Sequence, residues 1–228
     1  MEKAVVLLSG GLDSSTVLAM ALEKGYEVIA LTFNYGQRHG RELESAKNVA
    51  RHYGISEHVV MDLGLGSFVK SSLTDESEAI PQGRTRSEIG SGIPSTYVPG
   101  RNLVFLSIAS SLAESLGASA VFIAANSVDF SGYPDCTPEF IEAFQRTLDV
   151  GTKAGKEGRP VKVLAPIIRF SKAEIVREAV RLRVPLELTW SCYRGGAKAC
   201  GRCDSCMLRL QGFAEAGVED PIEYEVMK

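Results

Sequence analysis

The hydrophobic pattern of the chain alternates between short apolar runs and longer amphipathic stretches. Apolar runs of strand length lie at residues 3–8, 27–33, 57–61, 120–125 and 161–164. Stretches with the pattern of helices lie at residues 14–24, 41–53, 101–116, 137–150 and 171–182. The stretch at 101–116 is apolar around much of its circumference, which predicts a buried helix. Because strands alternate with helices, the pattern predicts a parallel sheet with right-handed crossovers and with ligands at the carboxyl ends of its strands.

Local signals mark several helix ends. Thr137 is a favourable cap for the helix that follows it, and Ser171 with Glu174 has the pattern of a capping box. Asn102 is a candidate cap for the helix at residues 101–116, and Asp204 is one for a helix beside the last cysteine. We therefore expect helices at these places.

Two segments interrupt the alternation. Residues 64–98 are rich in glycine, serine and proline and show no clear periodicity, which is typical of a lid, a partner-facing arm or a mobile segment. Residues 151–160 also lack a strong pattern, and we expect a mobile loop there.

Size and charge limit the possible functions. The chain has 228 residues, enough for one well-cored α/β domain and a small appendage, which we expect at residues 1–185 and 186–228. A net charge of −3 provides no long-range attraction to nucleic acid. No apolar run is long enough to cross a membrane, and the first residues do not resemble a signal peptide. We expect a cytoplasmic protein without a membrane or nucleic-acid partner.

The loop after the first apolar run has the residues of an anion site. Gly10 and Gly11 lack Cβ atoms, so backbone N–H groups can approach an anion closely. Ser14 or Ser15 then opens a helix, whose free N–H groups and positive dipole end point to the same place. The less specific interpretation is an ordinary glycine turn between a strand and a helix.

The order of residues in this loop selects the kind of anion site. A Walker A loop needs a lysine that is missing here, and the glycine spacing of a dinucleotide fingerprint is also missing. The loop resembles the signature of the pyrophosphate-loop ATPases, which cleave ATP between its α and β phosphates. On this resemblance the residues that bind ATP are Leu8, Ser9, Gly10, Gly11, Leu12, Asp13, Ser14, Ser15 and Thr16.

Four of the five cysteines lie close together near the end of the chain. Their spacing allows Cys192, Cys200, Cys203 and Cys206 to bind one tetrahedral ion, with zinc as the first choice and a structural role. The alternatives are an iron–sulfur cluster, although a ferredoxin run would need a cysteine where Leu210 stands, and thiols without a ligand. The fifth cysteine, outside this cluster, is either a nucleophile or, as we favour, a small buried apolar residue.

Polar residues also follow two other predicted strands and precede the helix at residues 101–116. These segments are residues 34–39, 97–102 and 126–136. Each could be a set of turn formers, caps and surface charges. Because the carboxyl ends of parallel strands meet at one edge, the three together favour a binding site that faces the phosphate loop.

The combination of motifs closely resembles the 7-cyano-7-deazaguanine synthase family of queuosine biosynthesis, from Ser9 to about Phe213. The resemblance depends on residues 9–14, 98–102, 131–136, 189–193 and 200–206. It implies a parallel-sheet, three-layer α/β fold of the adenine-nucleotide alpha-hydrolase type, which is Rossmann-like, with a small zinc-binding C-terminal appendage. It also implies a ligase that converts 7-carboxy-7-deazaguanine and ammonia to 7-cyano-7-deazaguanine. Both the acid and the amide are adenylated by ATP on the way.

The resemblance and the residue chemistry suggest individual roles. Asp13 orients the loop or contacts the Mg²⁺ that accompanies ATP, and Arg101 or Lys172 steadies charge at the α phosphate. Lys172 could instead be a solvated residue in a first helical turn. Candidates for binding the deazaguanine substrate are Asn102, Asp129, Tyr133 and Asp135.

Three other functions stay open at this point. A tRNA-thiolating pyrophosphate-loop enzyme would need a catalytic cysteine pair and a basic surface, and the chain is acidic. Another amidating ligase does not account for the four cysteines. A zinc-ribbon binding module, with the upstream domain as scaffold, does not account for the phosphate loop. We also expect a homodimer, with residues 64–98 as a candidate contact arm.

Overall fold

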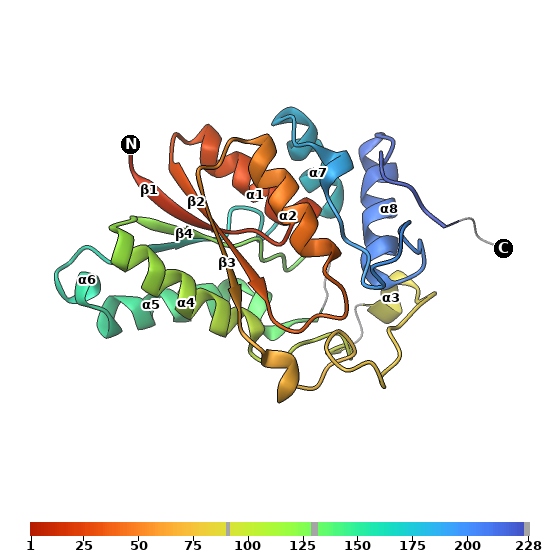
Figure 1. Ribbon diagram of the computed structural model, residues 1–228, viewed down its shortest axis with the longest axis horizontal. Coiled ribbons are helices and arrows are strands. Elements are labelled where there is room, and N and C mark those ends of the chain that lie inside the picture. The colour runs from red at the N-terminus through yellow and green to blue at the C-terminus, as the bar shows by residue number, and fades with distance from the viewer. Residues whose placement is uncertain (90–91, 129–131, 226–228) are drawn as a thin grey trace.

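A five-stranded parallel sheet forms the centre of the computed structural model, which describes residues 1–89, 92–128 and 132–225 (Figure 1). The strands lie in the order β3-β2-β1-β4-β5, and each neighbouring pair is parallel. Their bounds are β1 (Lys3–Leu7), β2 (Glu27–Asn34), β3 (Glu57–Asp62), β4 (Ala120–Phe122) and β5 (Lys162–Leu164). All five lie where the apolar runs predict strands.

Helices connect the strands and follow the last strand, and the last of them ends at Ala216. They are α1 (Leu12–Glu23), α2 (Arg41–His52), α3 (Arg86–Ile89), α4 (Arg101–Leu116), α5 (Pro138–Gly151), α6 (Lys153–Lys156), α7 (Lys172–Arg181) and α8 (Asp204–Ala216). Short 3₁₀ turns lie at Leu65–Ser67, Pro134–Cys136 and Leu186–Leu188.

The alternation of side chains along β1 divides the core into two layers. Ala4 and Val6 pack with residues of α1, α2 and α7, whereas Val5 and Leu7 pack with residues of α4 and α5 on the opposite face. Figure 1 shows α1, α2 and α7 above the sheet and α4 and α5 below it. The predicted three-layer α/β fold is confirmed.

Several helix ends differ from the predictions. Helix α1 begins at Leu12, before Ser14 and Ser15, because Gly11 already has the extended conformation of a cap. Asn102 is not a cap, since Gly100 precedes α4 with φ +66°. Asp204 is not a cap either, because Cys203 has that position and Asp204 is the first helical residue.

The segment at residues 151–160 is also more ordered than the predicted mobile loop. It contains α6, and the hydroxyl of Thr152 accepts a hydrogen bond of 3.0 Å from the backbone N–H of Gly155. The sequence pattern missed this helix because a single helical turn is too short to show a 3.6-residue period.

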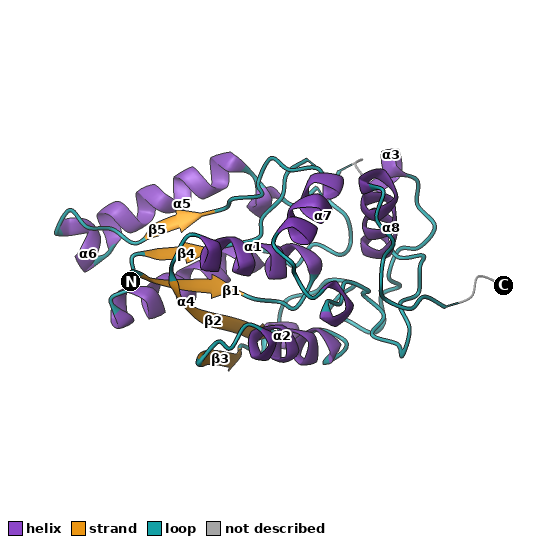
Figure 2. Ribbon diagram, turned by 90° about the horizontal axis from the view of Figure 1, so that it is seen from above, coloured by secondary structure: helices purple, strands orange, loops and turns teal. Residues whose placement is uncertain are grey.

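The C-terminal segment lies beyond the carboxyl ends of the strands, where α8 runs beside α7 (Figures 1 and 2). Phe213 of α8 belongs to the main core, whereas Trp190 and the four clustered cysteines form a small core of their own. The division of the chain at residue 185 stays a prediction. Within the described part of the chain, no helix has the length and apolar character needed to span a membrane.

Candidate active site and metal centre

The loop between β1 and α1 is closed by its own hydroxyl groups. The hydroxyls of Ser9 and Ser14 lie 3.0 Å apart, and the backbone N–H of Ser9 donates to the Ser14 hydroxyl over 3.2 Å. The N–H of Gly11 donates to the Ser9 hydroxyl over 3.3 Å. These contacts hold the loop against the start of α1, where helix N–H groups favour an anion.

Gly10 has a structural reason to be a glycine in addition to the one that the sequence suggests. Its φ is +78°, and a Cβ atom there would lie 2.4 Å from the backbone nitrogen of Ala46 in α2. Its carbonyl accepts a hydrogen bond of 2.9 Å from the N–H of Trp190. Gly10 therefore lets the loop pack directly on α2 and on the C-terminal segment. At Gly11 a Cβ would meet only ordinary contacts.

Two adjoining cavities open beside this loop, with volumes of about 250 and 200 Å³. The charged cavity, the larger one, is lined by Asp13, Arg101 and Lys172, and the apolar cavity by Leu31, Phe33 and Phe105 among others. The residues that line both are Ser9, Ser14, Glu42, Arg101, Ala124, Cys136 and Tyr193. The two cavities thus meet at the phosphate loop.

The nine predicted ATP-binding residues divide between the cavities and the core. Leu8, Ser9, Gly11, Leu12, Asp13 and Ser14 line one cavity or both. Gly10, Ser15 and Thr16 line neither. The Thr16 hydroxyl is buried and donates to the carbonyl of Leu12 over 2.8 Å.

An ion pair between two helix starts crosses the charged cavity. The Nζ of Lys172, at the start of α7, lies 2.8 and 3.0 Å from the two carboxylate oxygens of Asp13, in the first turn of α1. A Cβ at Gly212 of α8 would lie 2.3 Å from the Cγ of Lys172. Helix α8 therefore packs directly on the lysine side chain and fixes its direction.

Arg101 stands at the start of α4, between aromatic rings. Its guanidinium carbon lies 5.7 Å from the centre of the Tyr35 ring and 5.9 Å from that of Tyr133, within the range of cation–π contacts. The structure thus places the three predicted catalytic residues, Asp13, Arg101 and Lys172, around one cavity.

The predicted substrate-binding residues lie in different environments. Tyr133 lines the charged cavity, and its hydroxyl donates to the carbonyl of Thr96 over 3.1 Å. Asn102 lines the apolar cavity, and its backbone N–H donates to the Asp135 carboxylate over 2.9 Å. Asp135 is buried and lines neither cavity. Asp129 lies outside the described residues.

Cys136 lines both cavities as a buried thiol. The side-chain amide of Asn102 donates to its Sγ over 3.2 Å. Burial, together with the nearby Asp135 carboxylate, raises the pKa of the Cys136 thiol to about 11. A thiol that stays protonated near neutral pH is a poor nucleophile, which favours the packing interpretation.

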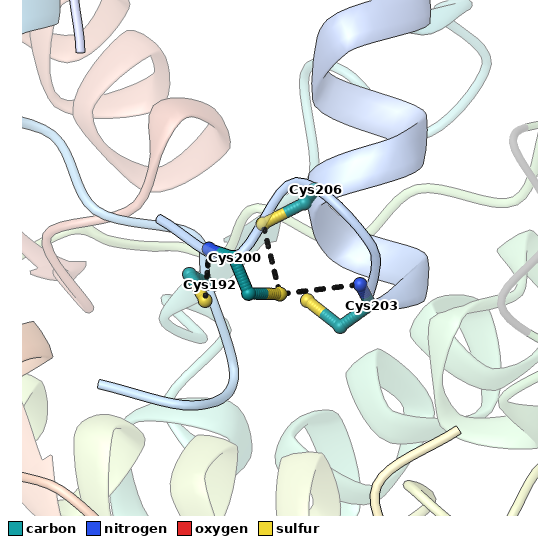
Figure 3. Close-up of side chains that lie close together, drawn as sticks. All are labelled: Cys192, Cys200, Cys203 and Cys206. Atoms are coloured by element: carbon teal, nitrogen blue, oxygen red, sulfur yellow. Dashed lines mark hydrogen bonds between the residues drawn. The ribbon is translucent and has the colours of Figure 1, made fainter. Parts of the chain in front are cut away.

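The four clustered cysteines converge on one point (Figure 3). Their Sγ atoms all lie within 4.8 Å of one another, and those of Cys200 and Cys206 lie 3.9 Å apart. Four sulfurs at about 2.3 Å from a tetrahedral metal ion lie about 3.8 Å from one another. The cysteine cluster therefore has the dimensions of a four-thiolate metal site.

Backbone N–H groups point at the sulfurs. The N–H groups of Arg194 and Cys200 donate to the Sγ of Cys192 over 3.4 and 3.3 Å. Those of Arg202 and Cys203 donate to the Sγ of Cys200 over 3.4 and 3.3 Å. Such donors stabilise thiolate charge, so the residues present fit a bound metal.

Sequence reasoning assigned no site role to several residues that line the charged cavity, among them three that carry a charge or a large ring. Glu42 of α2, Trp190 and Arg209 of α8 all line it. Arg209 is fully buried and forms an ion pair of 2.7 Å with Asp220, while Arg41 stacks on the Trp190 ring at 4.2 Å. Arg209 could have been noticed as a charge on the face of α8 that carries Phe213, but no local signal marks Glu42.

A solved structure of another protein has a similar fold. The solved structure of NMN synthetase from Francisella tularensis matches 96% of this chain and 78% of its own, with a TM-score of 0.50. The two sequences are 14% identical, so the likeness concerns the fold alone.

Curated relatives are much more similar. The 7-cyano-7-deazaguanine synthase of Acetivibrio thermocellus is 54% identical over 98% of both chains. The protein of that name from Thermoplasma acidophilum is 54% identical over 98% of this chain and 92% of its own, and that from Nostoc sp. is 50% identical over 99% of both. The family model described as queuosine biosynthesis protein QueC matches residues 3–217, and the chain belongs to that family.

Proposed function

We propose that the protein is an ATP-dependent ligase that converts 7-carboxy-7-deazaguanine and ammonia to 7-cyano-7-deazaguanine. The observation that carries the proposal is the identity of about half of all positions, over nearly the full length, with relatives named 7-cyano-7-deazaguanine synthase. The site supports it, because a phosphate loop without a Walker lysine opens onto a cavity lined by three cationic side chains and two carboxylates.

The reaction needs ATP because a carboxylate has no leaving group. An oxygen of the acid bonds to the α phosphorus, and pyrophosphate leaves with the electrons of the broken P–O bond. Ammonia then displaces AMP to give the amide. The amide oxygen attacks a second ATP in the same way, and loss of AMP leaves the nitrile. Two molecules of ATP are used for each nitrile, and water must be kept from the adenylates.

The cavities suggest where ATP binds. The phosphate loop holds the β and γ phosphates through the N–H groups near Gly11 and the hydroxyls of Ser9 and Ser14. The apolar cavity, with the stacked rings of Phe33 and Phe105 at 4.3 Å, takes the flat nucleobase. Arg101, at the junction, then lies beside the α phosphate, and Mg²⁺ neutralises the phosphates when it is bound.

The charged cavity is left for the acid. Lys172 and Arg101 attract its carboxylate, and Asp13 holds Lys172 in place. Tyr133 offers a ring for stacking on the deazaguanine. Asn102 and Asp135 act together, because the Asp135 carboxylate and carbonyl fix Asn102 at the start of α4.

Zinc at the four cysteines, with a structural role, and a homodimer complete the proposal. The cysteines fill all four positions of a tetrahedral ion, which leaves none for a substrate. Leu103, Ser107 and Ser111 give α4 an exposed face without charges, and Phe68 is 72% exposed in the long loop, which supports self-association. Five free cysteines suit the reducing cytoplasm, and a net charge of −3 supports the absence of a nucleic-acid partner.

The test is a product analysis. The protein is incubated with the carboxylic acid, ATP and ammonium, and the products are identified by mass and by phosphate analysis. We expect the nitrile, with two AMP and two pyrophosphate released for each one formed. ADP and orthophosphate in place of AMP and pyrophosphate would contradict the proposal.

A further inference from the structure

One carboxylate at the junction of the two cavities has no role so far. Glu42 lines both cavities, and so does Arg101. We propose that Glu42 is the catalytic base that accepts the N–H protons released when the amide and the nitrile form. This inference rests on the proposed function, because it concerns the reaction of that same site.

The fold holds Glu42 against the phosphate loop. Glu42 lies in the first turn of α2, which packs on the loop at Gly10. A Cβ on Gly10 would lie 2.7 Å from the carbonyl oxygen of Glu42, so the two backbones are in direct contact. This contact fixes the backbone of Glu42 at the junction, and its side chain lines both cavities, where on the proposed function the acid, the α phosphate and ammonia meet.

The other candidate bases at the junction are already engaged or are too weakly acidic. Asp13 and Glu42 are the only carboxylates among the described residues that line the two cavities, and Asp13 is paired with Lys172. Cys136 is a thiol with a raised pKa. Burial raises the pKa of the Tyr35 hydroxyl to about 12, so it too stays protonated. Glu42 is left as the group that can take a proton.

The surroundings of Glu42 suit a base that works near neutral pH. Burial raises the pKa of its carboxyl to about 7, the Arg101 guanidinium opposes the rise, and Cys192 adds to it. Other titratable or charged groups also face Glu42. Tyr35, Tyr193 and Cys136 line the apolar cavity with it. Asp13, Tyr133, Lys172 and Arg209 line the charged cavity with it, and Arg38 and His39 line a third, small cavity with it. A general base is most effective when its pKa lies near the working pH.

The two nitrogen steps each release a proton that Glu42 can accept. When ammonia bonds to the carbonyl carbon and AMP leaves with the electrons of the C–O bond, the new nitrogen carries one proton too many, and Glu42 takes it. After the amide oxygen is adenylated, the nitrogen loses one proton to solvent. Glu42 takes the other as the C–O bond breaks, so that the N–H electrons form the third C–N bond.

The experiment uses Glu42→Gln and begins from the amide, so that ammonia and its own protonation play no part. Glu44→Gln is the matched control, since Glu44 is on the same helix, is exposed and lines neither cavity. Pyrophosphate released in the first turnover measures adenylation, and the nitrile, measured by mass, reports the proton-dependent step. Melting temperature and metal content confirm that each variant is folded.

We expect Glu42→Gln to adenylate the amide within about threefold of the unchanged protein but to form the nitrile at least about 100-fold more slowly. Glu44→Gln should match the unchanged protein in both. Equal nitrile formation in Glu42→Gln would overturn the inference, and so would an equal loss of adenylation and nitrile formation. If the unchanged protein releases no pyrophosphate, the proposed function fails instead.

The pH profile gives a second test of the same step. With the amide as substrate, nitrile formation by the unchanged protein should fall as the pH drops below about 7, because Glu42 becomes protonated. The Glu42→Gln variant should lack this fall in rate and remain slow at every pH. If both proteins show the same fall in rate, a group other than Glu42 causes it.

Discussion

Two regions of the molecule are stabilised by different kinds of contact. One is the phosphate loop, between β1 and α1, and the other is the metal-binding segment, residues 190–206, which contains the four clustered cysteines. The loop is held by residues close to one another in the chain, such as Ser9 and Ser14. The metal-binding segment instead pairs with the long loop more than a hundred residues earlier, where Gln82 forms a bridge with Cys203 and Arg84 forms an ion pair with Asp204. A local motif thus shapes the loop between β1 and α1, while the part of the cavity wall formed by the C-terminal segment depends on contacts between distant segments.

The two regions meet at Gly10. Its carbonyl accepts a hydrogen bond from the backbone N–H of Trp190, and because it lacks a Cβ atom, α2 can pack directly against it. A metal bound by the four cysteines would therefore act at a distance. It would hold Cys203 in place and, through the neighbouring contacts, also the long loop and the Trp190 side of the charged cavity. Separate changes in each region can test this dependence.

Loss of the metal should have the largest effect. Cys203→Ser removes one thiolate, and we expect the segment to unfold locally, since structural zinc sites contribute about 10 kcal/mol or more to the folding of small domains. Activity should disappear, and trypsin should cleave after Arg84 as well as after Arg202. The measurements are metal content, turnover and mass analysis of the fragments.

Cys136→Ser is the control for metal content, because Cys136 lies outside the cysteine cluster. It should keep the metal and resist trypsin. If Cys203→Ser loses its metal but Arg84 stays protected, the long loop does not depend on the metal-binding segment, and the comparison drawn above is wrong.

A change confined to the phosphate loop should abolish chemistry without loosening the other region. In Asp13→Ala, Lys172 loses its partner, and we expect pyrophosphate release to fall by about 10²–10³-fold. Trypsin resistance and metal content should be unchanged. Glu23→Ala, at the exposed far end of the same helix, is the control and should keep full activity. If Asp13→Ala releases pyrophosphate as fast as Glu23→Ala, Asp13 has no role in the reaction.

The same division explains which features could be predicted from sequence. The alternation of Ala4 and Val6 with Val5 and Leu7, and the glycine-serine loop after them, are local patterns, so the strands, the fold and the phosphate loop were predictable. The cysteine spacing made the four-cysteine cluster predictable in the same way. The three-layer arrangement was confirmed, with helix ends shifted by one or two residues.

Features that depend on tertiary contacts could not be predicted. Glu42 is an ordinary polar residue in an amphipathic helix until Gly10 brings α2 against the loop. Asn102 resembles a cap in sequence, but its N–H is taken by Asp135, which is 33 residues away. The roles of the individual site residues stay predictions until ligands and variants are measured.

Gly10→Ala tests how much the close packing at Gly10, where the two regions meet, contributes to stability. Gly10 and Gly25 have similar positive φ values, +78° and +81°, but only Gly10 would bring its Cβ into backbone atoms of α2. Gly25→Ala should cost about 1 kcal/mol from backbone strain alone, and Gly10→Ala about 2–4 kcal/mol because overpacking is added. Urea unfolding measures both; equal losses would show that the close approach to α2 does not matter.

The smallest expected effect is the pH dependence of stability that Glu42, which packs beside Gly10, introduces. Its pKa is about 7 in the folded protein and near its ordinary value of 4.5 in the unfolded chain, so the folded state binds more protons between these values. The unchanged protein should therefore lose stability relative to Glu42→Gln as the pH rises from about 4.5 to 7, by about 1–3 kcal/mol. Urea unfolding of both proteins at pH 5 and pH 8 gives the difference. If the difference in unfolding free energy between the two proteins is the same at both pH values, the Glu42 carboxyl is as solvated in the folded protein as in the unfolded chain. The conclusion that Glu42 is buried between the two regions would then be wrong.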